Sequence, residues 1–158
     1  MALLLTTPQI TLTTDADSRL VRYVRTSVPY PSLEEYERLH ERAGHTLDKL
    51  GRKRHVLLVD MREATLNNDP AFERSATRCR LLLVRDFRRL AVLVKTAVGA
   101  LQIGRHIRED SLAAPVFNDE TAAISYLLAV SGFDAEPPAS SSGAPRSSRR
   151  GPGTRSDR

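Results

Sequence analysis

Short apolar runs and longer amphipathic stretches alternate along this chain. The clearest short run is His55–Asp60, HVLLVD, which is rich in apolar and β-branched residues and shows no polar alternation. A run of this length is too short for a surface helix and is typical of a central strand covered on both faces. Leu90–Lys95, LAVLVK, has the same character. The pattern therefore predicts two buried strands.

A different pattern near the start of the chain predicts a β-hairpin. Apolar and polar residues alternate in Gln9–Thr14 and again in Leu20–Thr26, and Asp15–Ser18 supplies turn-forming residues between them. Two alternating runs joined in this way are typical of antiparallel strands. A further short strand is predicted at Pro115–Phe117.

The first amphipathic stretch has clear signals at both ends. Ser32 and Glu35 have the spacing of a capping box, and Gly51 is a typical residue beyond a helix C-terminus. The apolar positions between them recur at helical spacing. They are Leu33, Tyr36, Leu39, Ala43, Leu47 and Leu50.

The other amphipathic stretches also follow capping residues. The predicted helices are 70–86 after Asp69, 97–109 after Thr96, and a last helix, ending at Gly132, after Asn118 or Asp119. Pro70 takes the first helical position, where its missing N–H costs nothing. Cys79 lies on the apolar stripe of its helix, so we expect a small buried hydrophobe. Gly99 and Gly104 are predicted to allow close packing of a helix on the sheet.

The element order is therefore β-β-α-β-α-β-α-β-α. Right-handed crossovers make the later strands parallel, and the opening hairpin makes the sheet mixed. The predicted fold class is α/β, with a mixed, mostly parallel sheet of about five strands and about four helices. Residues 1–133 form this domain. Residues 134–158 are rich in Ser, Pro, Gly and Arg and hold no large apolar side chain, so we expect a disordered tail.

Charge and aromatic content argue against nucleic acid as a partner. The formal net charge is only +5, and much of the arginine lies beside glutamate on the predicted helices. Aromatic residues make up 5% of the chain, with no Trp for base stacking. DNA binding through the Arg-rich tail is left as a weak alternative.

The sequence also lacks the usual targeting signals. Met1–Thr7 has no basic region and no small-residue cleavage site behind it. No apolar run approaches the roughly 18 residues that a membrane span needs. We therefore expect a cytoplasmic protein with no membrane span. A single cysteine excludes an internal disulfide.

No metal or phosphate motif is complete. His40 and His45 resemble a zinc-protease pair, but they are five residues apart, which places them on different faces of a helix. We expect two solvated histidines and no metal site. Gly99 and Gly104 have the spacing of a phosphate loop without its Lys and Ser/Thr. No catalytic residues and no cofactor are predicted.

Three segments, taken with the element order, resemble the STAS-like domains (sulfate transporter and anti-sigma factor antagonist). They are VLLVDMREA before a capped helix, LAVLVKT as the next strand, and PVFNDETAAISYL at the end. The resemblance covers about residues 9–133 and is nearest to the small stand-alone bacterial group related to the sporulation anti-sigma factor antagonist. It implies a non-enzymatic regulatory module that binds a protein partner, such as a regulatory kinase or another signalling protein.

The turn after the central strand departs from that family's pattern. STAS proteins typically read Asp-Ser-Ser/Thr-Gly there, and a partner kinase phosphorylates a serine. Aligning Asp60 with the family's aspartate places Asn68-Asp69-Pro70-Ala71 on the motif, so the usual phosphoacceptor serine is absent. Asp69 then either caps the helix or holds one constitutive binding state. The residues predicted to bind the partner are Asn67, Asn68, Asp69, Arg74 and Arg78.

Two further hypotheses stay open. STAS-like folds of this group also resemble CRAL-TRIO lipid-exchange domains, which implies a small ligand or lipid in an apolar cavity between helices and sheet. An enzyme would need converging catalytic groups, and Asp60, Asp69 and Thr96 at strand ends are the only plausible set. Aspartates at such positions more often cap helices or hydrogen-bond in turns.

Overall fold

The computed structural model describes residues 1–65 and 69–129 of the chain. The predicted tail, 134–158, lies outside the described residues, as do Asn67 and Asn68. The strands are β1 (Ala2–Thr6), β2 (Ile10–Asp15), β3 (Leu20–Arg25), β4 (Val56–Asp60), β5 (Leu90–Leu93) and β6 (Val116–Phe117). The helices are α1 (Leu33–Leu50), α2 (Pro70–Val84), α3 (Ala97–Glu109) and α4 (Glu120–Leu128), with a short 3-10 helix, η1, at Arg52–Arg54.

The strands form one mixed sheet in the order β1-β2-β3-β4-β5-β6. The β1–β2 and β2–β3 pairs are antiparallel, and the pairs from β3 to β6 are parallel. This confirms the predicted α/β class and its mostly parallel sheet. β4 lies between β3 and β5, and all of its residues are buried, as the uninterrupted apolar run predicts.

The first strand is a feature that the hydrophobic pattern does not reveal. β1 forms the edge of the sheet beside β2, and its register shifts between Leu3 and Leu5. An irregular edge strand needs no strict alternation, because only one side of it is paired and part of its surface faces solvent. Leu3 is accordingly 61% exposed.

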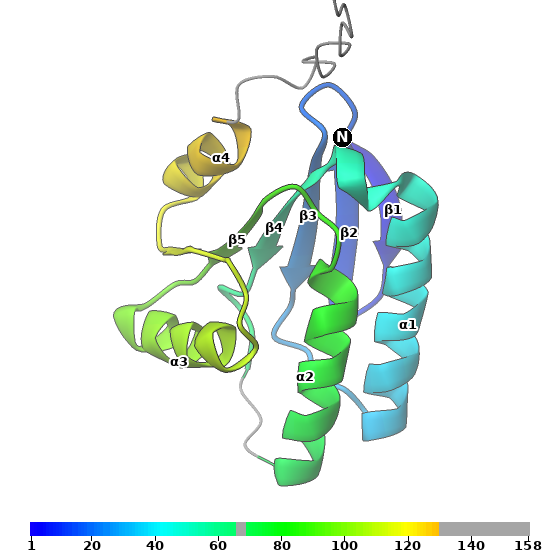
Figure 1. The fold of residues 1–158 in the computed structure, drawn as a ribbon. Coiled ribbons are helices and arrows are strands. Elements are labelled where there is room, and N and C mark those ends of the chain that lie inside the picture. The colour runs from blue at the N-terminus through cyan, green and yellow to red at the C-terminus, as the bar shows by residue number, and fades with distance from the viewer. Residues whose placement is uncertain (66–68, 130–158) are drawn as a thin grey trace, which may run out of the picture.

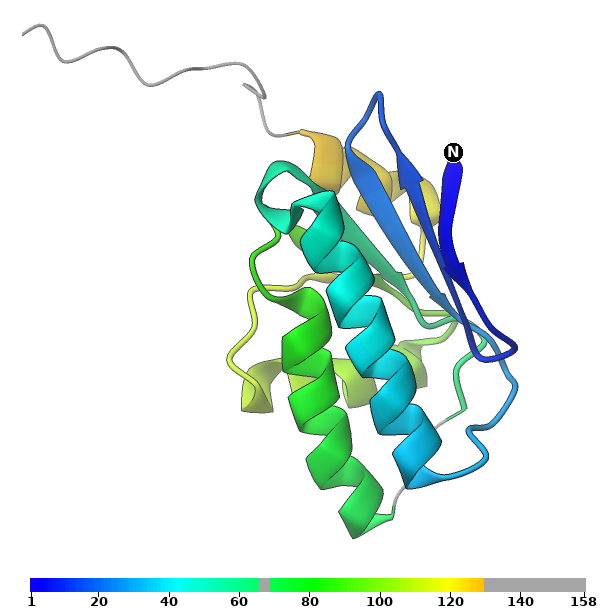
Figure 2. The same ribbon diagram turned by 90° about the vertical axis from the view of Figure 1, so that its right-hand side faces the viewer.

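Helices cover both faces of the sheet. Figures 1 and 2 show α1 and α2 side by side on one face, with α4 beyond the other. Leu57 and Val59 of β4 join the core under α1 and α2, whereas Val56 and Leu58 pack with α4. The alternate direction of successive side chains in a strand explains this division.

The predicted helix caps are formed, but only half of the capping box at Ser32 is, because the Glu35 side chain pairs with Arg38. The Ser32 and Thr96 hydroxyls accept from the backbone N–H of Glu35 and Gly99, at 3.1 and 3.0 Å. Asp119, rather than Asn118, caps α4. Gly51 has a φ of +85°, the left-handed conformation that follows many helices.

α3 packs more loosely than the sequence predicts. None of its residues is buried, and the apolar side chains Ala100, Ile103 and Ile107 only partly cover the core. A side chain at Gly104 would meet only the flexible Arg108. This glycine therefore does not bring the helix close to the sheet, and the prediction of close packing there is wrong.

A chain of ion pairs holds α4 on the opposite face. The Asp60 carboxylate is 4% exposed and accepts from Arg62 Nε and Nη2, at 2.9 and 2.6 Å. Glu120, in the first turn of α4, bridges Arg62 and Arg22 at 2.9 and 2.6 Å. The hydrogen bond from Arg22 lowers the pKa of the Glu120 carboxyl, so its charged form is favoured.

Candidate functional site: a cavity between two helices and the sheet

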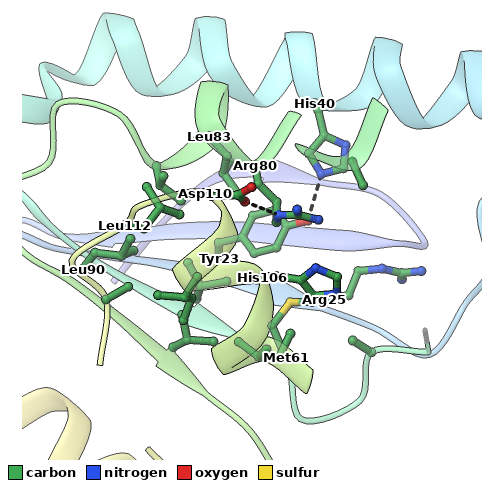
Figure 3. Close-up of a pocket in the computed structure, with 18 of the residues that line it drawn as sticks. Tyr23, Arg25, His40, Met61, Arg80, Leu83, Leu90, His106, Asp110 and Leu112 are labelled. Carbon is green, nitrogen blue, oxygen red and sulfur yellow. Dashed lines mark hydrogen bonds and ion pairs between the residues drawn. The ribbon is translucent and has the colours of Figure 1, made fainter. Parts of the chain in front are cut away.

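A cavity of about 150 Å³ lies between α2, α3 and the sheet (Figure 3). Its floor comes from β3, β4 and β5, and α1 contributes to one end. Because α3 stays loosely packed, the space beneath it is not filled by its own side chains. The apolar lining includes Val59, Leu83, Leu90, Val92, Ile103 and Ile107.

Aromatic rings form the end of the cavity nearest α1. The Tyr36 ring centroid lies 4.7 Å from Tyr30, 4.6 Å from Phe72 and 4.2 Å from His40. Tyr30 and Tyr36 meet edge to face, an arrangement that the quadrupoles of the two rings favour. The end wall of the cavity therefore presents ring surfaces.

Tyr23 and His40 are a buried hydrogen-bonded pair at this wall. The Tyr23 hydroxyl lies 3.3 Å from His40 Nε2, and His40 Nδ1 lies 2.8 Å from the Tyr36 carbonyl oxygen. A neutral imidazole satisfies both contacts, donating from Nδ1 and accepting at Nε2. Burial lowers the pKa of His40 to about 4, chiefly through desolvation of the charged ring.

The structure corrects the prediction of two solvated histidines. His45 is exposed, but His40 is only 4% exposed and lines the cavity. Within residues 1–65 and 69–129, no three His, Cys, Asp or Glu side chains are grouped so that they could hold a metal ion.

An ion pair between α2 and the end of α3 closes another side of the cavity. Arg80 Nε lies 2.9 Å from Asp110 Oδ2, and the Asp110 side chain is 4% exposed. Arg80 Nη2 also donates to Thr77 Oγ1 at 3.0 Å. The charge of this guanidinium is therefore already matched by a buried carboxylate (Figure 3).

Arg25 is the second guanidinium of the cavity and has a different environment. It is 5% exposed, and its Nη1 donates to the carbonyl oxygens of Gln9, Thr26 and Val28 at 3.0, 2.6 and 2.8 Å. Its guanidinium carbon lies 4.3 Å from the Tyr30 ring centroid, a cation–π contact. No carboxylate of the described residues forms an ion pair with it.

Each of the considered catalytic residues has another role in the fold. Asp60 pairs with Arg62 on the α4 face, whereas Asp69 and Thr96 cap α2 and α3. Cys79 is buried, as predicted, and desolvation raises the pKa of its thiol to about 11, which favours the unreactive protonated form. None of these groups is placed as an activated nucleophile beside a base.

Three of the predicted partner-binding residues are described: Asp69 precedes α2, and Arg74 and Arg78 lie on it, whereas Asn67 and Asn68 lie outside the described residues. Asp69 Oδ1 accepts from the Ala71 N–H at 2.8 Å and so caps the helix. Arg78 pairs with Glu37 of α1 at 3.2 Å, whereas Arg74 is exposed. Asp69 lines a second hollow, of about 290 Å³, beside the cavity, and Arg74 and Arg78 line neither space.

Sequence reasoning missed the polar residues of the cavity, although two of them had a local signal. Arg25 continues the inward-facing series Val21 and Tyr23 of β3, so alternation places its side chain inside. His40 is four residues after Tyr36 and three before Ala43, on the apolar face of α1. Arg80 and Asp110 had no such signal, because their contact depends on how α3 packs.

No helix in the described parts of the chain is both long and apolar enough to cross a membrane. No protein-family model matches the sequence, and no curated protein or solved structure is significantly similar to it.

Proposed function

We propose that this chain is a binding protein for a small, mostly apolar ligand, which it holds in the cavity between α2, α3 and the sheet. The observation that carries the proposal is the cavity itself, an apolar space with a few fixed polar groups at its margin. Ligand sites have this composition, because apolar walls supply affinity and a few polar groups orient the ligand.

The volume of the cavity limits the size of the ligand. A protein cavity of about 150 Å³ lined by apolar side chains can hold benzene, whereas drug-sized ligands occupy pockets of about 300–1,000 Å³. The cavity described above has a volume of about 150 Å³. A ligand of about one ring therefore suits it better than the lipid of a CRAL-TRIO domain.

Filling the cavity should abolish ligand binding. We expect Ile103→Trp to weaken binding of toluene by about 10-fold or more, because the larger side chain occupies space under α3 that the ligand needs. Ligand-observed NMR titration of the purified protein measures this. Leu101→Trp is the matched control, since Leu101 lies on the same helix but is 74% exposed and does not line the cavity.

Two results would contradict this proposal. One is that toluene, indole and other one-ring compounds fail to bind the wild-type protein at concentrations near their solubility. The other is that both tryptophan variants reduce binding equally, which would place the ligand outside the cavity.

A second candidate is a STAS-like regulatory module that binds a protein partner through the start of α2. The exposed side chain of Arg74 supports it, because no ion pair with a described residue neutralises this guanidinium. Arg78 is a weaker contributor, since Glu37 already compensates its charge. Asp69, as a helix cap, would fix the start of this surface.

Reversing the charge of Arg74 tests this second candidate. We expect Arg74→Glu to abolish capture of a cognate protein from lysate, with a change in stability within about 0.5 kcal/mol because the residue is exposed. Arg42→Glu on the exposed side of α1 is the control. Equal capture by both variants and by wild type would remove Arg74 from the interface.

A further inference from the structure

We infer that the ligand of this cavity carries a carboxylate that pairs with Arg25, so that the ligand class is a small aromatic acid of about benzoate size. This inference rests on the proposed ligand-binding function and adds the chemistry of the ligand. It is carried by the contrast between the two guanidinium groups that line the same space, Arg25 and Arg80.

The guanidinium of Arg25 is buried, and no carboxylate within residues 1–65 and 69–129 pairs with it. All of its hydrogen bonds to protein oxygens are donated by Nη1. Nη2 and Nε donate to no acceptor among residues 1–65 and 69–129. Glu73 of α2 lines the cavity but forms no ion pair with Arg25. Carbonyl oxygens and the Tyr30 ring stabilise a cation only in part, and a buried charge normally has a counter-ion.

The other basic side chains of the cavity offer an anion less uncompensated positive charge than Arg25 does. Asp110 already neutralises Arg80 at 2.9 Å. Burial lowers the pKa of His40, so its ring is neutral, and the neutral ring fits both of its hydrogen bonds. His106 lines the same space, with its Nδ1 3.6 Å from Glu109 Oε2, so its charged form would also face a carboxylate of the protein.

The position of Arg25 suits the carboxylate of a ring compound. Figure 3 shows Arg25 at one end of the cavity, opposite Leu90 and Leu112. Tyr30 and Phe72 border the cavity at the same end. A planar ring in the apolar space can therefore direct an acid group toward a planar guanidinium, and the two nitrogens of Arg25 that lack acceptors suit a bidentate pair.

The outer hollow on the far side of Arg25 is a poorer place for an anion. Arg25, Tyr30 and Phe72 line this hollow too, but so does Asp69, whose carboxylate caps α2. A second negative charge beside Asp69 would be repelled. The cavity also has a carboxylate in its lining, that of Glu73, so repulsion alone does not decide the side. The ring of the ligand needs the apolar lining of the cavity, and the anion is therefore expected on the cavity side of Arg25.

Benzoate and benzamide form a probe pair that differs in charge but hardly in shape. For the wild-type full-length protein, we expect benzoate to bind roughly 10-fold more tightly than benzamide in NMR or calorimetric titrations. Benzoate should also shift the Arg25 Nε–H resonance, whereas benzamide should shift it less. Arg25→Gln should reduce the preference for benzoate to about one. Arg42→Gln is the control and should leave it unchanged, because Arg42 is exposed and does not line the cavity.

The outcomes separate this inference from the proposed function. If toluene and benzamide bind in the cavity but benzoate binds no better, the ligand is neutral and the inference fails while the function stands. If His106→Gln, rather than Arg25→Gln, removes the preference, Arg25 is not the partner. If no ring compound binds, the proposed function itself fails. Should Arg25→Gln not fold, the wild-type preference and the Arg25 Nε–H shift still decide the question.

Discussion

Arg52→Ala is expected to destabilise the protein by about 3 kcal/mol, because it removes a buried side chain that donates to carbonyl oxygens at the end of α2 and in α1. The Arg52 side chain is only 2% exposed. Its Nη1 donates to the carbonyls of Leu82 and Leu83, both at 2.8 Å, and its Nη2 donates to that of Gly44 at 2.9 Å. One side chain thus joins η1, the last turn of α2 and the middle of α1.

Urea denaturation of wild type, Arg52→Ala and Arg54→Ala measures the effect. Arg54 belongs to the same short helix but is exposed, so its loss should change the free energy of unfolding by less than about 0.5 kcal/mol. Arg52→Lys should recover only part of the loss, because an ammonium group cannot reproduce the planar fork of donors. A loss below about 1 kcal/mol in Arg52→Ala would show that water replaces the guanidinium at these carbonyls.

Local signals account for most of what the sequence predicted about the fold. The caps at Ser32, Thr96 and Asp119 join side chains to backbone groups no more than three residues away, so they can be read without knowing the tertiary structure. The uninterrupted run of β4 reflects burial on both faces. The β1 strand was missed because its place depends on pairing with β2, and an edge strand keeps no regular pattern.

The candidate site depends on contacts that are distant in the sequence. Arg80 and Asp110 are 30 residues apart, and Tyr23 and His40 come from different elements. The cavity exists because α3 does not close on the sheet, which is a property of packing and not of periodicity. A helical pattern predicts which side chains face inward, but it does not predict how well they fill the space that they face.

The buried His40 should make the stability of the protein fall as the pH falls from about 6.5 to about 4. The pKa of His40 is about 4 in the folded protein, against an ordinary value of 6.5. Between these values the unfolded chain binds a proton that the folded protein excludes, so acid favours unfolding. The stabilisation is complete above pH 6.5 and is lost as the pH falls toward 4. A change of one pKa unit corresponds to about 1.4 kcal/mol, so the loss approaches about 3 kcal/mol.

Two histidines on one helix allow this contribution to be isolated. Carboxylates also titrate in this range, so the quantity to measure is the difference in unfolding free energy between wild type and His40→Gln from pH 7 to pH 4. We expect this difference to change by about 2–3 kcal/mol, because glutamine cannot be protonated in this range. Protonated His40, in contrast, no longer accepts a hydrogen bond from the Tyr23 hydroxyl. His45→Gln, at an exposed position of the same helix, is the matched control. Parallel curves for wild type and His40→Gln would mean that His40 takes up its proton in the folded protein without cost, and the aromatic wall of the cavity would then be open to water.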